Sequence, residues 1–276
     1  VVVAIVSVQV GSSVAKDLFE HAAPVAVSWL RLVSAAVILG VVARPRVRGR
    51  AASEWVWVIA YGLAMALMNV SFYLAIERIP IGMSVTLEFL GPLGVAVAGS
   101  RRARDLLWVA LAAAGVALLG FTPGDLDPIG VALALTAGAL WAGYILLAGP
   151  TGRRWSGVTG VTVACWTGAL ALTPAVLWLG VLPGAEPVVW AQGFAIGLLA
   201  SVVPYGLEMV ALRSILPSVF GILMSLEPAA AALAALVMLG EELRVVEVAA
   251  MACVIVASIG VVRSRPPVPD AGNLGA

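Results

Sequence analysis

Charge is scarce in this chain. Asp, Glu, Lys and Arg together make up 11% of its 276 residues, against roughly 25% in soluble domains. Apolar residues reach 62%, so the composition excludes an ordinary soluble globular protein and indicates a multi-pass membrane protein in contact with a lipid bilayer. Because a spanning helix needs about 20 apolar residues, the chain has room for about ten spans.

Residues that build metal centres and catalytic pairs are also rare. The chain has one His and two Cys, and Cys165 and Cys253 lie in apolar stretches without metal-type or CxxC spacing. No Asp falls deep within a predicted span, since Asp17 lies at the end of the first one. An enzyme inside the membrane needs a nucleophile with its base, or a metal cluster, so we expect no enzymatic activity, no metal and no cofactor. Nothing in the sequence supports binding of nucleic acid.

Apolar runs and the breakers between them predict an all-α polytopic membrane protein with ten transmembrane helices. Short connections rich in Pro, Gly or charge separate the runs, and no soluble domain is inserted. The predicted spans are 1–19, 24–43, 54–76, 80–99, 106–121, 128–148, 158–180, 188–211, 217–238 and 246–262.

Basic residues gather in alternate connections. Twelve of the sixteen Lys and Arg residues fall in the second, fourth, sixth and eighth connections or in the C-terminal tail, whereas the other connections carry mainly Asp and Glu. Cytoplasmic loops collect Lys and Arg. We therefore expect both termini in the cytoplasm and an even number of spans across the inner membrane of a prokaryotic cell.

The two halves of the chain resemble each other. Segment 79–92 matches segment 216–228 with a single-residue gap, and each runs from a loop Pro through Leu-Glu to a Pro inside the helix. These segments belong to predicted helices four and nine, so the repeat unit is five helices and the second copy is inverted. The predicted units are 1–122 and 123–265, followed by a disordered cytoplasmic tail over 266–276. Inverted repeats with interrupted helices are typical of secondary transporters, whose substrate site lies near the midplane.

Four charged residues lie deep inside apolar stretches: Arg31, Glu88, Glu208 and Glu227. A charge at the bilayer centre costs roughly 2.5–3.5 kcal/mol even on the lenient insertion scale, so it normally lines a cavity, a relay or a binding site. These residues predict an internal polar site.

Glu88 and Glu227 each lie beside a proline. Pro92 removes the donor for the Glu88 carbonyl, and Pro228 removes the donor for the Met224 carbonyl, so both helices are predicted to open near the midplane. A carboxylate at such a point can take up and release a proton as its access to water changes. The alternative is that a neutral Glu only satisfies the freed backbone.

Arg31 lies in predicted helix two, where its guanidinium can fork onto a carboxylate. The partner is either a substrate carboxylate or one of the buried glutamates in a structural ion pair. Glu208 follows Pro204 and Tyr205 by one turn in predicted helix eight, toward the cytoplasmic end. Both a transport role and a hydrated, passive role stay open for Glu208.

Several polar and aromatic residues complete the candidate site. Asn69 and Tyr73 share one helix face at i,i+4 spacing, either as a cavity wall or as hydrogen-bonding contacts between helices. Trp141 and Tyr144 at i,i+3 spacing form either an aromatic wall of the site or ordinary core packing. Tyr205, next to Pro204, is the remaining candidate.

At these residues the sequence resembles the EamA branch of the drug/metabolite transporter superfamily, and within it the threonine/homoserine exporters. The similarity runs through nearly the whole chain and is carried by segments 11–16, 30–32, 68–73, 87–92, 100–102, 204–209 and 224–228. It implies a ten-helix inverted-repeat fold and export of small amino acids or related metabolites, coupled to proton entry. The fold alone does not define the substrate.

Other functions fit the sequence less well. A passive channel needs a continuous polar stripe along several helices, whereas polarity here is confined to a few midplane positions. A purely structural subunit has no need of buried glutamates. A secondary transporter exporting threonine-like or homoserine-like amino acids is the leading prediction, and a broader drug or metabolite exporter, or an uptake carrier of the same fold, is the alternative. The sequence does not predict an oligomeric state.

Overall fold

The computed structural model describes residues 1–98, 105–119, 127–155, 158–182, 184, 186–205, 207, 223–241 and 244–264, and within these ranges the protein is helical and contains no β-strand. The elements are α1 (Val2–Leu18), α2 (Pro24–Ala43), α3 (Ala52–Ile76), α4 (Ile81–Glu88), α5 (Leu90–Ala98), α6 (Asp105–Leu119), α7 (Pro128–Arg154), α8 (Thr159–Trp178), α9 (Pro187–Gly197), the π-helical η1 (Leu198–Val202), α12 (Glu227–Leu239) and α13 (Val245–Ser264).

These helices correspond to the predicted spans. If α4 with α5, and α9 with η1, are each counted as one interrupted helix, the described residues hold ten helices. Five of them are long and apolar enough to cross a membrane by length and composition, namely Pro24–Ala43, Ala52–Ile76, Pro128–Arg154, Thr159–Trp178 and Pro187–Tyr205, and shorter apolar helices make up most of the rest.

The predicted end of the sixth span at residue 148 is wrong. The helix α7 continues to Arg154 and includes the arginines that were expected in the sixth connection. Pro150 lies in the last turns of the helix, where Arg154 Nη1 donates to the Pro150 carbonyl at 2.8 Å. A proline near a helix end removes only one backbone hydrogen bond, here the one to the Leu146 carbonyl, so the helix can continue past it.

Prolines and glycines define many of the helix ends. Pro24, Pro128 and Pro187 lie in the first turns of α2, α7 and α9, where the missing N–H has no helical partner in any case. Gly240 ends α12 with a φ of 68°, the left-handed conformation in which glycine carries no Cβ penalty. The sequence therefore encodes most boundaries locally.

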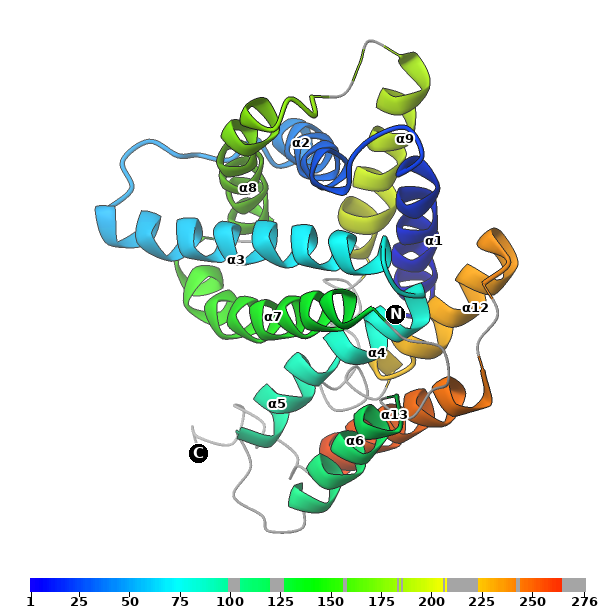
Figure 1. Cartoon of the computed structure of the whole chain (residues 1–276). Coiled ribbons are helices and arrows are strands. Elements are labelled where there is room, and N and C mark those ends of the chain that lie inside the picture. The colour runs from blue at the N-terminus through cyan, green and yellow to red at the C-terminus, as the bar shows by residue number, and fades with distance from the viewer. Residues whose placement is uncertain are drawn as a thin grey trace, which may run out of the picture.

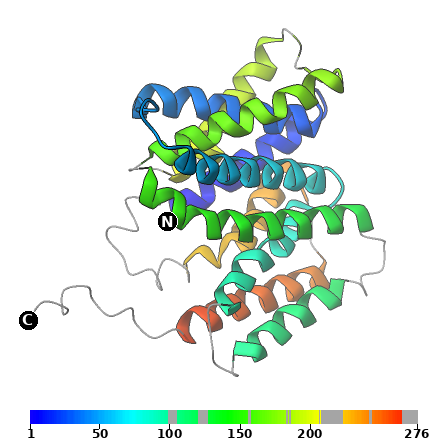
Figure 2. The same ribbon diagram turned by 90° about the vertical axis from the view of Figure 1, so that its left-hand side faces the viewer.

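The antiparallel pair α3 and α7 forms the middle of the bundle (Figure 1). On one side of this pair lie α2, α8 and α9, and on the other lie α4, α5, α6 and α13. The helices α6 and α13 pack along each other, and α1 packs against α12, α9 and η1. Figure 2 shows the same layers from the side, with α3 and α7 lying side by side across the molecule.

One end of the bundle gathers arginines from the second and sixth connections. Arg50 forms an ion pair with Glu54 at 2.9 Å, donates to the Arg154 carbonyl at 2.8 Å and lies over the Trp155 ring. Arg154 in turn lies over the ring of Trp57. These two connections meet as the predicted alternation requires.

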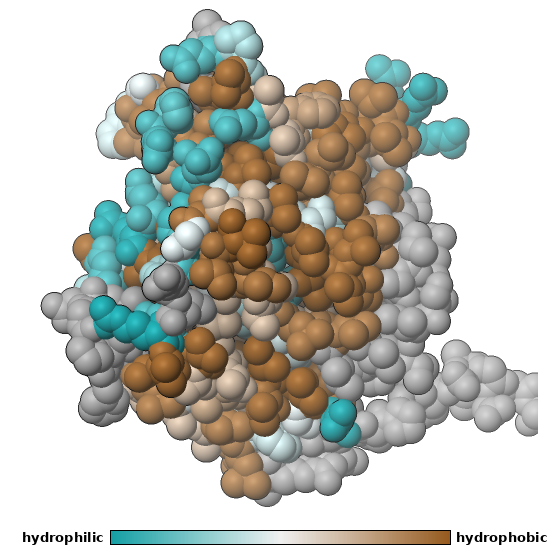
Figure 3. Space-filling model, turned by 90° about the vertical axis from the view of Figure 1, so that its right-hand side faces the viewer, coloured by the Kyte–Doolittle hydropathy of each residue, from teal (hydrophilic) through white to brown (hydrophobic). Residues whose placement is uncertain are grey.

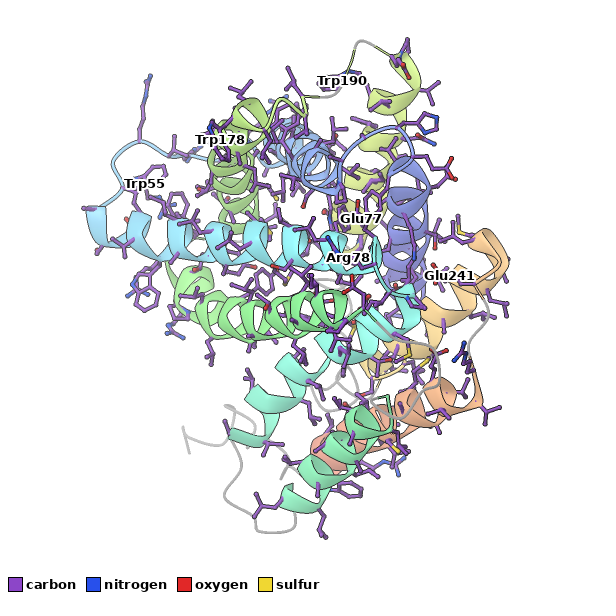
Figure 4. All side chains as sticks on the ribbon, in the orientation of Figure 1. Trp55, Glu77, Arg78, Trp178, Trp190 and Glu241 are labelled. Carbon is purple, nitrogen blue, oxygen red and sulfur yellow. The ribbon has the colours of Figure 1, made fainter. Side chains whose placement is uncertain are left out.

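The opposite end joins connections that carry acidic residues. Lys16 forms an ion pair with Glu241 at 2.5 Å, and Arg78 forms one with Asp127 at 2.9 Å. Figure 4 shows Trp55 and Arg78 at opposite ends of α3, with Glu241 beyond Arg78 near the end of α12. The first, third, fifth and ninth connections therefore share this end.

Large apolar side chains cover the outside of the bundle. Leu107, Leu233 and Val237 are 69%, 62% and 75% exposed. Figure 3 shows one face as a broad apolar surface with hydrophilic residues gathered at its margins. Such a surface matches contact with lipid rather than with water.

Candidate functional site

The predicted interruption of the fourth span lies directly after Glu88. Helix α4 ends at Glu88 and α5 begins at Leu90. Pro92 has no N–H to donate to the Glu88 carbonyl, and this carbonyl instead faces α7, where a Cβ placed on Gly138 would lie 2.7 Å from its oxygen. Glycine at position 138 thus allows the released carbonyl to approach the neighbouring helix.

The ninth span is interrupted just before Glu227. Residues 225 and 226 form a turn, and α12 begins at Glu227 with Pro228 in its first turn. Pro228 cannot donate to the Met224 carbonyl. Glu227 is buried, as is Glu88, so both glutamates lie at a helix break inside the protein, as the sequence predicts.

The two breaks lie next to each other in the bundle. Helix α4 packs against α12, and a Cβ on Gly82 would lie 2.9 Å from the Cβ of Ala232. Phe89, which separates α4 from α5, belongs to the same apolar cluster as Met224. Segments more than 130 residues apart in sequence therefore bring their interruptions together.

Arg31 is buried in α2 and donates three hydrogen bonds to neutral oxygen atoms. Its Nη2 donates to the Ala200 carbonyl at 2.7 Å, its Nε to Ser201 Oγ at 3.0 Å and its Nη1 to the Tyr73 hydroxyl at 3.4 Å. The guanidinium also interacts electrostatically with Glu88. Within the part of the chain that the structure describes, no carboxylate oxygen lies within 4.0 Å of Arg31. The alternative of a direct ion pair with Glu88 is therefore not what the structure shows.

The Ala200 carbonyl is available to Arg31 because of Pro204. In a regular α-helix that carbonyl accepts from the residue four positions later, and Pro204 has no N–H. The backbone around it is π-helical: the Val203 N–H donates to the Leu198 carbonyl. The next carbonyl, of Leu199, accepts from Ser7 Oγ at 2.6 Å. Side chains from α1 and α2 thus satisfy a short stretch of irregular backbone, a feature often found at functional sites.

Tyr73 connects Arg31 to α3. Its ring is fully buried, 5.8 Å from the Arg31 guanidinium carbon and 5.8 Å from the ring of Phe19. Asn69, one turn earlier on the same face, is also buried. Both predicted residues therefore lie on the side of α3 that faces the interior.

The two predicted aromatic residues of α7 have different neighbours. Trp141 lies edge-on to Phe89 with ring centroids 5.6 Å apart, beside the break at Glu88. Tyr144 stacks on Tyr61 at 4.5 Å and interacts with Tyr205. Trp141 thus contacts the segment between α4 and α5, whereas Tyr144 contacts α3 through Tyr61. Glu208 lies outside the described residues.

Three buried polar atoms have no hydrogen-bond partner among the described residues near these helices: Gln9 Oε1, Ser28 Oγ and Ser84 Oγ. Ser84 precedes Glu88 by one turn on α4, and Ser28 precedes Arg31 by three residues on α2, so each shares a face with a buried charge. Buried polar atoms without partners are rare in proteins.

Sequence reasoning did not identify Ser7, Ser201 or Gly138. A signal near Ser201 existed in the sequence. Pro204 leaves the carbonyl of Ala200, the residue before Ser201, without its helical donor, just as Pro92 and Pro228 do for the carbonyls four residues before them. Gly138 and Ser7 contribute through contacts between distant helices, and no local pattern marks them.

Comparisons with known proteins agree with this architecture. The model of the EamA-like transporter family matches residues 128–263. The threonine/homoserine exporter RhtA of Escherichia coli strain K12 is 38% identical over 94% of this chain and 88% of its own length, and RhtA of Salmonella typhimurium strain LT2 is 37% identical over the same shares. The chain belongs to the EamA-like transporter family. It is therefore a multi-pass membrane transporter and not an enzyme.

A solved crystal structure supports the fold. It superposes with a TM-score of 0.63 over 95% of both chains at 17% sequence identity. At that identity the likeness concerns the path of the backbone alone. The arrangement of the helices in this member of the EamA-like family is thus one that an experimentally determined protein shares.

Proposed function

We propose that this transporter exports threonine, homoserine or closely similar small amino acids across the bacterial inner membrane by proton antiport with alternating access. The observation that carries the proposal is the pair of adjacent helix breaks, each with a buried glutamate, in α4 and α12. The relatives named threonine/homoserine exporters supply the substrate class.

The proposed mechanism places the proton on Glu88 and Glu227. A carboxylate in an apolar interior is costly when charged, so protonation makes the site easier to close away from water. Arg31, Glu208, Asn69, Tyr73, Tyr205, Trp141 and Tyr144 are proposed to line the route of the substrate. On the cytoplasmic side, the site releases its protons and binds the substrate. On the outer side, the site releases the substrate and takes up protons.

The proposed architecture is two inverted repeats, over 1–122 and 123–265, with both termini and the arginine-rich end of the bundle in the cytoplasm. The clustering of Arg50 with Arg154 at one end, and of Lys16 with Glu241 at the other, supports this orientation. Single cysteines in a variant without Cys165 and Cys253 test it. Labelling at residues 44–50 from the cytoplasmic side is expected, and labelling at residue 125 from that side would contradict the orientation.

Transport by purified protein in lipid vesicles tests the function. An imposed pH gradient is expected to drive labelled threonine and homoserine against their concentration gradients, and protein-free vesicles are the control. Movement of cationic drugs without movement of any amino acid would favour the broader drug or metabolite exporter. Net accumulation of threonine by intact cells that produce the protein would favour an uptake carrier.

A further inference from the structure

Arg31 is a buried cation whose hydrogen-bond acceptors in the described structure are all neutral. Guanidinium groups bind carboxylates more strongly than they bind carbonyls or hydroxyls, because the bond is charge-assisted and forked. The hydrogen bonds of Arg31 to the Ala200 carbonyl, Ser201 and Tyr73 are therefore ones that an incoming carboxylate can displace.

Displacement has a consequence for the Ala200 carbonyl. Pro204 supplies no N–H to it, and the Val203 N–H is already used by the Leu198 carbonyl. If Arg31 turns to another acceptor, the Ala200 carbonyl loses the hydrogen bond from Arg31 Nη2, which is costly in an apolar interior. A ligand that brings a donor of its own restores that bond.

We propose that Arg31, Ser201 and the Ala200 carbonyl form the subsite for the charged head group of an α-amino acid, an inference that rests on the proposed function. The ligand carboxylate accepts hydrogen bonds from the Arg31 guanidinium. The ligand ammonium donates to the Ala200 carbonyl and to Ser201 Oγ. The hydrogen bond within the protein between Arg31 and Ala200 is thereby replaced by at least three bonds to a single zwitterion, one to its carboxylate and two from its ammonium.

The polarity of the subsite favours a zwitterion over either singly charged group. A simple carboxylate satisfies Arg31 and leaves the hydrogen bond that Arg31 gave to the Ala200 carbonyl unreplaced. A simple amine satisfies the carbonyl and places a second positive charge beside Arg31. Interrupted helices with free carbonyls near the midplane are the places where transporters bind charged groups, and η1 lies between α1 and α2, which contact it from two sides.

Ser7 provides a matched control on the same irregular segment. Its hydroxyl donates to the Leu199 carbonyl at 2.6 Å from α1, whereas Ser201 accepts from Arg31. Both serines are buried and both stabilise η1 or its contacts. Only Ser201 belongs to the proposed subsite, so Ser7→Ala reports a structural effect on η1 and Ser201→Ala reports that effect together with ligand binding.

The experiment is competition against labelled threonine in counterflow through lipid vesicles. The competitors are threonine, threoninamide, which lacks the carboxylate, and N-acetylthreonine, which lacks the ammonium. For the wild type we expect each analogue to compete roughly tenfold or more weakly than threonine, the factor for one lost charge-assisted hydrogen bond. Arg31→Lys and Ser201→Ala are expected to raise the half-saturating threonine concentration roughly tenfold and several-fold, with the maximal rate less affected. Ser7→Ala is expected to raise that concentration clearly less than Ser201→Ala does, because it disturbs η1 without touching the ligand.

The outcomes separate this inference from the proposed function. A wild-type protein that moves no amino acid contradicts the proposed function and with it the subsite. Amino acid flux with equal competition by threoninamide contradicts the subsite alone, as do equal shifts in Ser7→Ala and Ser201→Ala. If the Arg31→Lys variant does not insert into the membrane, the subsite is still tested by comparing the two serine variants and by the analogue competition in the wild type.

Discussion

The break after Glu88 and the break before Glu227 come from similar sequence segments but differ in their surroundings. Glu88 is the last residue of α4, between the C-terminus of that helix and the N-terminus of α5, whereas Glu227 is the first residue of α12. Helix N-termini favour negative charge and C-termini disfavour it. The two glutamates therefore occupy electrostatically different positions.

The neighbouring proline explains the difference. Pro92 follows Glu88 by four residues and frees the carbonyl of Glu88 itself, whereas Pro228 follows Glu227 directly and frees the carbonyl of Met224. The first freed carbonyl packs against Gly138 of α7. A shared motif thus produces one break that is held by a neighbouring helix and one that places its glutamate in the first turn of a new helix.

The largest expected effect is on proton-coupled transport. Glutamine at position 88 or 227 keeps the size of the side chain and its hydrogen bonding but cannot titrate. We expect Glu88→Gln and Glu227→Gln each to reduce transport driven by a pH gradient to the level of empty vesicles, while counterflow exchange survives. Glu54→Gln, at the arginine-rich end of the bundle, is the control. Normal pH-driven transport in both variants would reassign the two glutamates to holding the broken helices, and loss in only one would show which break carries the proton.

A second test concerns the glycine that distinguishes the break at Glu88. A Cβ at position 138 would lie 2.7 Å from the Glu88 carbonyl oxygen, whereas a Cβ at Gly143 of the same helix meets no atom within 4 Å. Gly138→Ala is expected to destabilise the protein by roughly 1–3 kcal/mol, the range for overpacking. Gly143→Ala is expected to stabilise it slightly, because alanine is the better helix former. Thermal unfolding in detergent measures both, and equal unfolding temperatures would show that the break at Glu88 does not depend on α7.

The contrast between these two glycines shows which features could be predicted from the sequence and which could not. Prolines predicted both interrupted helices, and the bounds of α2 match the predicted span, because such features depend on residues a few positions apart. Gly138 and Gly143 look alike in sequence, and only the position of α5 and Glu88 against α7 separates them. The π-helical η1 lay inside a predicted continuous span, because its stability depends on Arg31 and Ser7 from two other helices.

A third, smaller effect is expected where the outer ends of α4 and α12 are joined. Glu241, just after α12, accepts from the Ile81 N–H at 2.9 Å at the start of α4 and forms an ion pair with Lys16. Glu241→Gln retains an acceptor for Ile81 and loses the charge. We expect a loss of roughly 0.2–1 kcal/mol, as for partly exposed ion pairs, and a smaller loss in high salt.

The exchange of the two charges sharpens this third test. A variant with Lys16→Glu and Glu241→Lys restores opposite charges but removes the acceptor for the Ile81 N–H. Recovery of the unfolding temperature in this variant would assign the effect to the ion pair. No recovery would assign it to the hydrogen bond from the Ile81 N–H in the first turn of α4.

The smallest expected effect is at Asp127, which joins the connection before α4 to α7, the helix that supports the break at Glu88. Hydrogen bonds from Arg78 and from the Ile129 N–H, each at 2.9 Å, hold the pKa of the Asp127 carboxyl below its ordinary value of 3.8. Because the pKa is lower in the folded than in the unfolded state, the ionised carboxylate stabilises the fold above pH 3.8, and this stabilisation is lost as the pH falls through the lowered value.

Asp127→Asn keeps an acceptor for the Ile129 N–H and removes the charge. We expect a small decrease in the unfolding temperature at pH 7 that shrinks in high salt and disappears in acid, since an exposed ion pair is screened by water and ions. Asp17→Asn, which changes an exposed acid outside the ion pairs of the described residues, is the control. A difference between Asp127→Asn and the wild type that stays constant from pH 7 into the acid range would show that Asp127 acts only as the cap of α7, and that the ion pair with Arg78 does not help to hold α7 against the break at Glu88.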